Sequence, residues 1–253
     1  MTKAQIKLIR SLQLKKYREA EGLFVAEGKK LVEELLNSSI QVNEVFISDY
    51  YAISYPEYSL PHTAYPLALT IVSGEELEKI SSLTTPQGIL AICRLPAESK
   101  SQPDLKKELV LALDDIRDPG NMGTIIRIAD WFGIRHIFCT EECADTWNPK
   151  VIQASMGSIA RITVHNSGIT QLLNRAGESA PVYGALLKGK NIYKERLTSN
   201  GILVIGNEAR GISLEIQKFI THPLCIPAFN ANGPESLNAA AAAAILCSEF
   251  RRR

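Results

Sequence analysis

Three stretches of this sequence place side chains that can do chemistry directly after an apolar run. The runs are LVLALD (109–114), GILVIG (201–206) and LCIP (224–227), and the stretches that follow them are rich in Asn, Asp, Glu and Arg. Amide, carboxylate, hydroxyl and guanidinium groups can hold a polar ligand and handle the proton of a hydroxyl. The candidate residues are Asn121, Arg127, Asn207, Glu208, Arg210, Ser236 and Asn238.

The glycine-rich turn DPGNMG, after the first of these runs, matches neither of the common nucleotide-binding loops. It lacks the G-x-G-x-x-G spacing, and no Lys-Ser or Lys-Thr follows its last glycine. An enzyme that uses NAD or another nucleotide through such a loop is therefore disfavoured. Among the five cysteines, Cys139 and Cys143 are separated by three residues, and no Cys or His pair at zinc spacing occurs elsewhere, so no metal site is predicted. We interpret all five as reduced thiols of a cytoplasmic protein.

Each stretch also has a purely structural explanation. Arg127 could pair on the surface with Asp130, three residues further along the same predicted helix. Ser236 could simply cap the last helix, and a glycine at the end of a strand, such as Gly206, is ordinary. Any one of the three stretches is weak support for a function.

Apolar runs alternate with helical segments along the whole chain, which predicts an α/β fold. Near-continuous apolar strands after residue 108 predict a parallel sheet covered on both faces, where the carboxyl ends of the strands meet at one edge. Ser73 and Glu76 form a capping box for a helix in the first part. The predicted strands are 23–27, 42–48, 88–94, 109–114, 136–140, 161–165, 181–187, 201–206 and 224–227, and the predicted helices include 28–37 and 236–250.

A segment rich in Pro, Ser and charged residues, RLPAESKSQPDLKKE (94–108), separates two parts of the chain. We therefore expect a first domain over residues 1–95, a linker over 96–107 and a second domain over 108–253.

Taken together and in this order, the three stretches resemble the motifs of the SpoU/TrmH branch of the SPOUT superfamily, the S-adenosylmethionine-dependent RNA ribose 2′-O-methyltransferases. Upstream, YREAEGLFVAEGKKLVEELL (17–36) and LTTPQGILAI (83–92) resemble the substrate-binding domain of many members. One departure is that Ala228 and a longer loop, AFNANGPE, follow Ile226 and Pro227, where the family usually has Met and a shorter loop. The matching positions are Asn121, Gly123, Arg127, Phe132 and Gly133 in the first motif, Gly206, Asn207, Glu208 and Gly211 in the second, and Ile226, Pro227, Ser236, Leu237 and Asn238 in the third.

The resemblance implies a parallel-sheet SPOUT domain with a deep C-terminal trefoil knot, preceded by a small α/β sandwich that binds the RNA substrate. It implies methyl transfer from S-adenosylmethionine to a ribose 2′-hydroxyl, with ribosomal RNA favoured and transfer RNA second, in a homodimer without metal or membrane. A non-catalytic RNA-binding relative stays the alternative. The implied catalytic residues are Arg127, Asn121, Glu208, Ser236 and Asn238, and the implied cofactor-binding residues are Leu186, Gly206, Asn207, Ile226, Pro227 and Leu237.

Arg127 is proposed in relatives to act as a general base. A guanidinium normally stays protonated, so stabilising the developing alkoxide, or gripping an RNA phosphate that takes the proton, is physically easier. The resemblance leaves both roles open.

The formal net charge is only +1, but residues 1–18 contain six cations and no acid. From charge alone, a solvated amphipathic helix is the simpler interpretation of this segment. Because the resemblance implies an RNA substrate, we expect phosphate contacts there instead. These cations are Lys3, Lys7, Arg10, Lys15, Lys16 and Arg18. The N-terminus has no apolar core of a signal peptide, and no apolar run is long enough to cross a bilayer.

Overall fold

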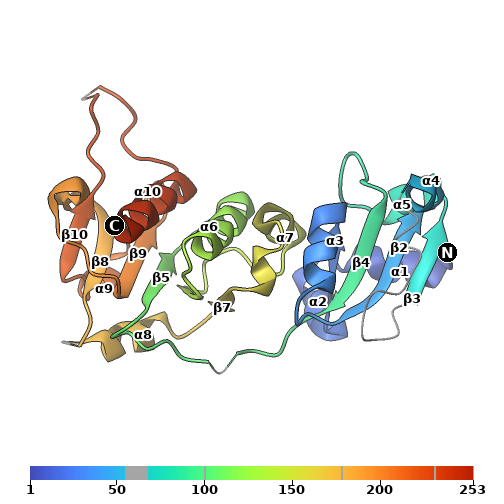
Figure 1. Ribbon diagram of the computed structural model, residues 1–253, viewed down its shortest axis with the longest axis horizontal. Helices are drawn as coiled ribbons and strands as arrows, with labels where there is room; N and C mark the ends of the chain where they lie inside the picture. The colour runs from blue at the N-terminus through green and yellow to red at the C-terminus, as the bar shows by residue number, and fades with distance from the viewer. Residues whose placement is uncertain (55–67, 100, 178, 231, 253) are drawn as a thin grey trace. The chain divides into compact units, whose positions relative to one another are not determined.

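The computed structural model describes residues 1–54, 68–99, 101–177, 179–230 and 232–252. The chain forms two compact units (Figure 1). Unit 1 contains Met1–Ala97 and Trp147–Ala160, and unit 2 contains Glu98–Thr146 and Arg161–Arg253. Residues 147–160 belong to unit 1 because they pack against it. α7 (Pro149–Ser155) lies against β1 (Leu23–Glu27), and the ring centroid of Trp147 lies 4.8 Å from that of Phe24.

Unit 1 is built on a mixed four-stranded sheet in the order β1-β4-β2-β3. β4 pairs antiparallel with β1 and β2, and β3 pairs parallel with β2. Ile9 of α1 and Leu77 of α5 pack onto one face of this sheet, together with Val25 and Phe46. The elements are α1 (Lys3–Ser11), α2 (Lys15–Glu21), α3 (Lys29–Leu36), β2 (Val42–Ser48), α4 (Asp49–Ser54), β3 (Ala68–Val72), α5 (Gly74–Ile80), β4 (Ile89–Arg94) and a 3-10 turn (Ser158–Ala160).

The strands predicted over 23–27 and 42–48 are confirmed with these bounds. The capping box is also confirmed, because the Ser73 hydroxyl accepts from the Glu76 backbone while the Glu76 carboxylate accepts from the Ser73 backbone. The edge strand β3 was not predicted from the sequence.

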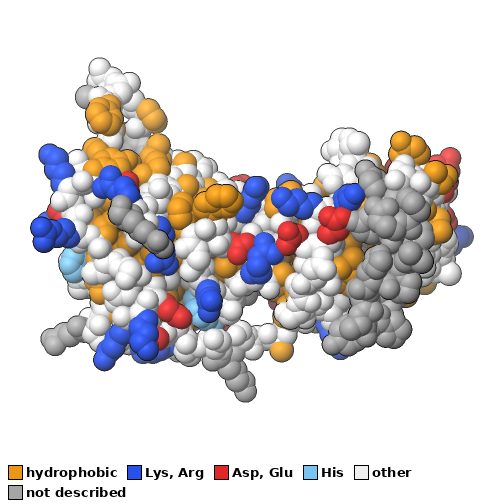
Figure 2. Space-filling model, viewed as in Figure 1, with side chains coloured by type: hydrophobic (Ala, Val, Ile, Leu, Met, Phe, Trp, Pro, Cys, Tyr) orange, Lys and Arg blue, Asp and Glu red, His pale blue; other side chains and the backbone are white. Residues whose placement is uncertain are grey.

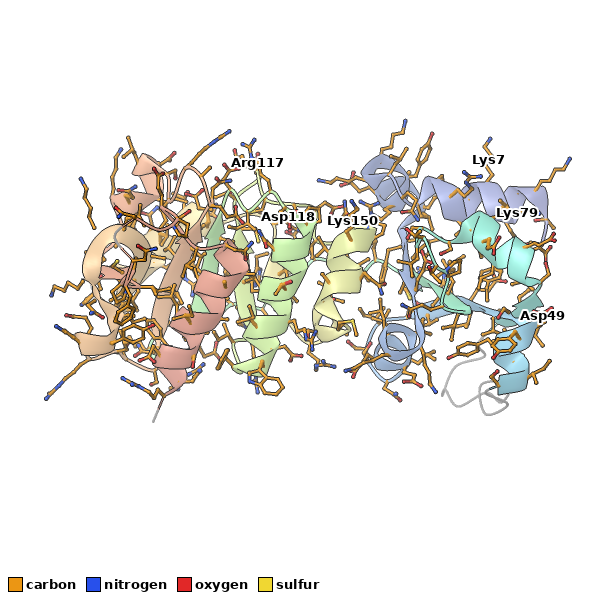
Figure 3. The ribbon with its side chains drawn as sticks, turned by 90° about the horizontal axis from the view of Figure 1, so that it is seen from above. Lys7, Asp49, Lys79, Arg117, Asp118 and Lys150 are labelled. Atoms are coloured by element: carbon orange, nitrogen blue, oxygen red, sulfur yellow. The ribbon has the colours of Figure 1, made fainter. Side chains whose placement is uncertain are left out.

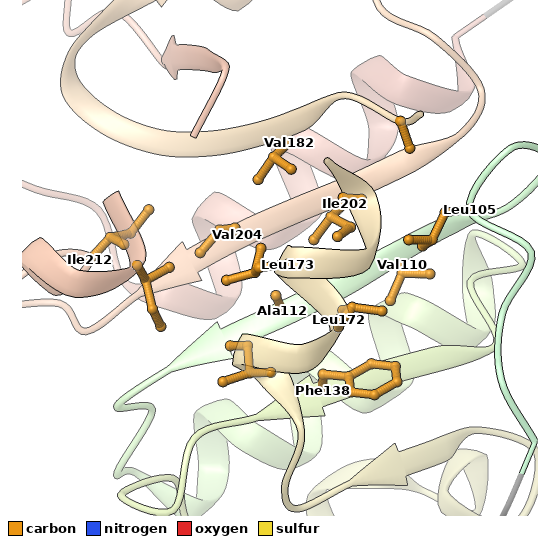
Figure 4. Close-up of a cluster of buried hydrophobic side chains, with 14 residues drawn as sticks. Leu105, Val110, Ala112, Phe138, Leu172, Leu173, Val182, Ile202, Val204 and Ile212 are labelled. Carbon is orange, nitrogen blue, oxygen red and sulfur yellow. The ribbon is translucent and has the colours of Figure 1, made fainter. Parts of the chain in front are cut away.

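Unit 2 contains a six-stranded sheet in the order β10-β8-β9-β5-β6-β7, and every neighbouring pair is parallel, as predicted. On one face, Leu172 and Leu173 pack among alternate strand residues such as Val110 and Val204 (Figure 4). The helices α6 and α10 pack against each other, and α10 also packs against β9. The elements are β5 (Leu109–Asp114), α6 (Pro119–Trp131), β6 (His136–Cys139), β7 (Thr163–His165), α8 (Ile169–Ala176), β8 (Val182–Asn191), a 3-10 turn (Ile192–Lys194), β9 (Gly201–Gly206), α9 (Leu214–Gln217), β10 (His222–Cys225) and α10 (Ala239–Arg251).

Several predicted boundaries in unit 2 are wrong. β7 covers Thr163–His165 instead of 161–165, and β8 covers Val182–Asn191 instead of 181–187. The last strand covers His222–Cys225 instead of 224–227, so that Pro227, which has no backbone N–H to donate, lies outside it. The last helix begins at Ala239 instead of 236, because the Asn238 side chain accepts from the backbone N–H groups of Ala240 and Ala241. The N-cap is therefore Asn238, which leaves Ser236 available for another contact.

A very close approach of two backbone segments occurs between β8 and β10. The pairing register moves from Pro223 opposite Gly184 to Leu224 opposite Lys190, so residues 185–189 of β8 have no partner in β10. A Cβ built on Gly189 would lie 2.4 Å from the carbonyl carbon of Leu224. Glycine is therefore required where Leu224 passes β8.

We expect Gly189→Ala to destabilise this part of unit 2 by about 1–3 kcal/mol, because the new methyl group would force the Leu224 backbone to move. Gly74→Ala is the control, since a Cβ there meets no atom of the described structure within 4 Å. Hydrogen exchange of the β8 and β10 amides, followed by mass spectrometry, measures the change. Equal protection of these amides in the two variants would show that the approach is not limiting.

Candidate active site at the ends of β5, β9 and β10

The junction between β5 and α6 fixes the position of Asn121. Asp118 is the N-cap of α6, and its carboxylate accepts from the Asn121 backbone N–H at 2.8 Å. Pro119 occupies the first helical position, which suits its fixed φ angle. Asn121 thus lies in the first turn of α6, and its side chain is free to make contacts outside the helix.

The side chain of Asn121 joins the three predicted stretches. Its Nδ2 donates to Oε1 of Glu208, after β9, and its Oδ1 accepts from Nδ2 of Asn238 at 2.9 Å. The Ser236 hydroxyl donates to the backbone carbonyl of Glu208 at 3.0 Å. The structure therefore brings together four of the five predicted catalytic residues.

Asn207 links the first and second stretches through its side chain. Its Nδ2 donates to the backbone carbonyl of Asp115 at 2.9 Å, while its Oδ1 accepts from the backbone N–H groups of Ala209 and Arg210. Its own backbone pairs with that of Gly211 in both directions. Both parts of Asn207 are thus occupied in holding the turn.

Arg127 lies apart from this cluster. It is exposed, and within the described part of the chain its side chain forms no hydrogen bond or ion pair. Six residues of α-helix place it about 240° around the axis and about 9 Å along it from Asn121. The surface pair with Asp130 is wrong, because the Asp130 carboxylate accepts from Arg161, with the Nη2–Oδ2 distance 2.8 Å.

The predicted cofactor-binding residues come from neighbouring strands. Leu186 lies in the stretch of β8 that has no partner in β10, and it packs against the edge of the apolar cluster. Ile226 and Pro227 are half-buried directly after β10, and Leu237 is 44% exposed between Ser236 and Asn238. The described residues of the longer loop, 228–230 and 232–235, project from unit 2 with hydrophobic side chains exposed, Phe229 among them (Figures 1 and 2).

A second set of hydrogen bonds that holds the β5–α6 junction was not predicted from the sequence. The Thr140 hydroxyl accepts from the Asp115 backbone N–H at 3.0 Å, and Sγ of Cys143 accepts from that of Ile116 at 3.3 Å. A hydrogen bond from Cys139, and those from Ile116 and Thr140, lower the pKa of the Cys143 thiol to about 7 against the opposing effect of burial. A cysteine among charged loop residues gave no sequence signal for this contact.

Five of the six predicted RNA-binding cations are exposed. Lys7 lies on the outer side of α1 in Figure 3. Arg18 does not fit the prediction, because its side chain is 2% exposed and Nη1 donates to the Leu12 carbonyl at 2.8 Å. Arg18 therefore fastens the segment between α1 and α2 and is not placed to touch RNA. The exposed cations are Lys3, Lys7, Arg10, Lys15 and Lys16.

In the described part of the chain, no group of three His, Cys, Asp or Glu side chains is placed to hold a metal ion. The helices described there are also too short or too polar to span a bilayer.

Comparison with known proteins identifies the family. Residues 108–248 match the model of the SpoU rRNA Methylase family. The chain belongs to this family. Residues 3–91 match the model of the MRM3-like substrate binding domain, so the resemblance seen in the sequence is confirmed in both parts.

Among the relatives of this SpoU chain is the 23S rRNA (guanosine(2553)-2′-O)-methyltransferase RlmP of Bacillus subtilis, 30% identical over 98% of the chain and 96% of the relative. A solved structure assigned to the TrmH family of RNA methyltransferases, from Porphyromonas gingivalis, is 39% identical with a TM-score of 0.84, over 99% and 98% of the two chains. An AdoMet-bound rRNA methyltransferase from Sinorhizobium meliloti is 27% identical with a TM-score of 0.79, over 99% and 95%.

We expect Cys143 to react with iodoacetamide with a midpoint near pH 7, because the thiolate is the nucleophile. Burial raises the pKa values of Cys93 and Cys247, and the hydrogen bond to Cys143 together with burial raises that of Cys139, so these thiols should react slowly at that pH. Peptide mass spectrometry after short exposures between pH 6 and 9 measures the rates, with Cys143→Ser as the control. A midpoint above pH 8 at Cys143 would contradict the described hydrogen bonds.

Proposed function

We propose that this protein transfers a methyl group from S-adenosylmethionine to a ribose 2′-hydroxyl of RNA, with ribosomal RNA as the substrate. The observation that carries the proposal is the hydrogen-bonded cluster of Asn121, Glu208 and Asn238, at the three stretches that match the SpoU motifs. The relative RlmP is named for this reaction on 23S rRNA, which favours ribosomal over transfer RNA.

The residues near β8 and β10 fit S-adenosylmethionine, which supplies an already activated methyl group when it is bound. Residues 185–189 have backbone groups outside the pairing with β10, and apolar side chains of Leu186, Ile226 and Leu237 are only partly buried. Free backbone groups beside apolar surface suit a flat heteroaromatic base. We propose that these residues and Pro227 hold the cofactor, while Gly206 and Asn207 shape the turn next to it.

The cluster orients the ribose hydroxyl. The Asn121 amide is fixed by Glu208 and Asn238, so the polar groups around it are already in place before RNA arrives. Aligning the reacting oxygen in this way can lower a barrier by several kcal/mol, up to about 7–11 in favourable systems. The Arg127 guanidinium stabilises the negative charge that develops on the oxygen while the hydroxyl proton passes to water.

We propose that Arg127 reaches the cluster of a partner subunit in a homodimer. Thr124, Arg127 and Trp131 are exposed on one stripe of α6, and Trp131 is 84% exposed. Exposed tryptophan is typical of protein interfaces, and the stripe points away from the Asn121 of its own chain. A second copy on this face would supply the missing cation.

We also propose that the C-terminal segment forms a deep trefoil knot, which the close approach of Leu224 to Gly189 supports. A cytoplasmic location is proposed from the five free cysteines, which suit a reducing compartment.

We expect Arg127→Ala to abolish methyl transfer to ribosomal RNA while S-adenosylmethionine binding stays nearly unchanged. A radiolabelled methyl-transfer assay and isothermal titration measure the two effects. In Arg127→Lys, activity that is flat through neutral pH would favour charge stabilisation over base catalysis. Retained turnover in Arg127→Ala would remove this residue from the mechanism.

Mixing subunits tests whether Arg127 acts across the dimer. Arg127→Ala and Asn121→Ala should each be inactive alone, and together they should regain up to about a quarter of wild-type activity, because half of the dimers are mixed and each has one complete site. No recovery in dimers shown to exchange subunits would place Arg127 in its own chain's site.

We propose that the exposed cations of α1 and α2 contact the RNA backbone. Neutralising Lys3, Lys7 and Arg10 to Gln should weaken RNA binding and lower the slope of log K against log salt by about 0.7–0.9 per lost phosphate contact. Lys30→Gln on α3 is a control for the loss of an exposed cation elsewhere in unit 1. Unchanged affinity in the triple variant would show that α1 is a solvated helix without RNA contacts.

A further inference from the structure

One carboxylate in unit 2 gathers two arginines from different junctions. Oδ1 of Asp115 lies 2.5 Å from Nε of Arg117, in the β5–α6 junction, and Oδ2 lies 3.5 Å from Nη1 of Arg210, in the turn after β9. The two guanidinium groups therefore lie side by side, one on each oxygen of the same carboxylate.

Most of the hydrogen-bonding capacity of these arginines is unused. Their side chains are 53% and 67% exposed, whereas that of Asp115 is 14% exposed. Among the described residues, Asp115 is the one hydrogen-bond and ion-pair partner of the Arg117 and Arg210 side chains. Because each guanidinium has five N–H donors, several donors of the pair still face solvent.

The arginines are not needed to hold the two junctions together. The Asn207 side chain already connects them, donating to the Asp115 carbonyl and accepting from the backbone of Arg210. An excess of positive charge does not describe this surface either. The exposed Glu142 carries a second negative charge that attracts Arg117, in addition to that of Asp115. What the arrangement provides is two guanidinium groups in a fixed mutual position.

The pair lies next to the catalytic cluster. Arg117 is beside Asp118 at the N-terminal end of α6 (Figure 3), where Asp118 caps the turn that carries Asn121. In RNA, the carbon that bears the 2′-hydroxyl is bonded to the carbon that carries the 3′-phosphate. When a ribose binds at Asn121 and Glu208, its 3′-phosphate therefore lies close to these two residues.

We propose that Arg117 and Arg210 form a fork that binds one backbone phosphate of the RNA substrate, adjacent to the methylated ribose, with Asp115 as the residue that orients it. This inference rests on the proposed function. Two neighbouring guanidinium groups match the oxygens of a phosphate, and charge-assisted hydrogen bonds of this kind are stronger than neutral ones.

The test measures binding of a fluorescein-labelled, single-stranded RNA 20-mer of mixed sequence by anisotropy at several salt concentrations. We expect Arg117→Ala and Arg210→Ala each to weaken binding about tenfold. The double variant should also lose about tenfold instead of a hundredfold, because both arginines hold the same phosphate, and its salt slope should fall by about 0.7. Lys107→Ala, an exposed cation before the other end of β5, should change neither quantity.

Independent, multiplicative losses in the double variant, an unchanged salt slope, or an equal loss in Lys107→Ala would overturn the proposal. Melting temperature and S-adenosylmethionine binding, measured for every variant, show whether the fold is intact.

Asp115→Asn distinguishes an oriented fork from simple attraction. Asp115 has a φ of +59°, in the left-handed region that Asn also tolerates, so the backbone should be kept. If Asp115 orients the fork, the variant binds RNA more weakly although a negative charge has been removed. Tighter binding would overturn this role. RNA binding needs no turnover, so a protein that binds RNA through the fork but methylates none would contradict the proposed function and leave the fork standing.

Discussion

The candidate site depends on the amide of Asn121, which is a donor on one side and an acceptor on the other. It contacts Glu208, 87 residues along the chain, and Asn238, 117 residues along. A carboxylate at this position would repel Glu208, and an apolar side chain would leave the Glu208 carboxylate without this donor. The Asn121 amide satisfies both neighbours, so one side chain fixes three loops relative to one another.

The parallel sheet of unit 2 makes that contact possible. β5 and β9 are adjacent and in register, with Asp114 opposite Gly206, so the residues that follow them leave the sheet at the same edge. The turn after β9 must be tight, since a Cβ on Gly206 would lie 2.4 Å from the carbonyl carbon of Gly211. The loop before α10 reaches the same edge through the hydrogen bond from Ser236 to Glu208.

The sequence was sufficient to predict features that depend on neighbours in the chain. The apolar runs predicted the parallel sheet, and the capping box at Ser73 was read directly from residue types. Features that depend on distant packing were missed. The burial of Arg18 is decided by the Leu12 carbonyl and the core beneath it, and the return of Trp147 to unit 1 is decided by Phe24. The role of Cys143 requires the backbone of Ile116, which no spacing reveals.

The spacing between Asn121 and Arg127 illustrates why a motif match alone does not place a side chain. Arg127 follows Asn121 by six positions, which is about 240° around the helix, so two positions of one motif face different directions. Asn121 is half-buried, and its side chain is paired with Glu208 and Asn238 of its own chain. The Arg127 side chain is exposed to water, where an unpaired guanidinium has little cost in free energy. The negative charge that Arg127 stabilises exists only during the reaction. If Arg127 formed a permanent ion pair, that pair would have to be broken in the transition state, which would raise the barrier.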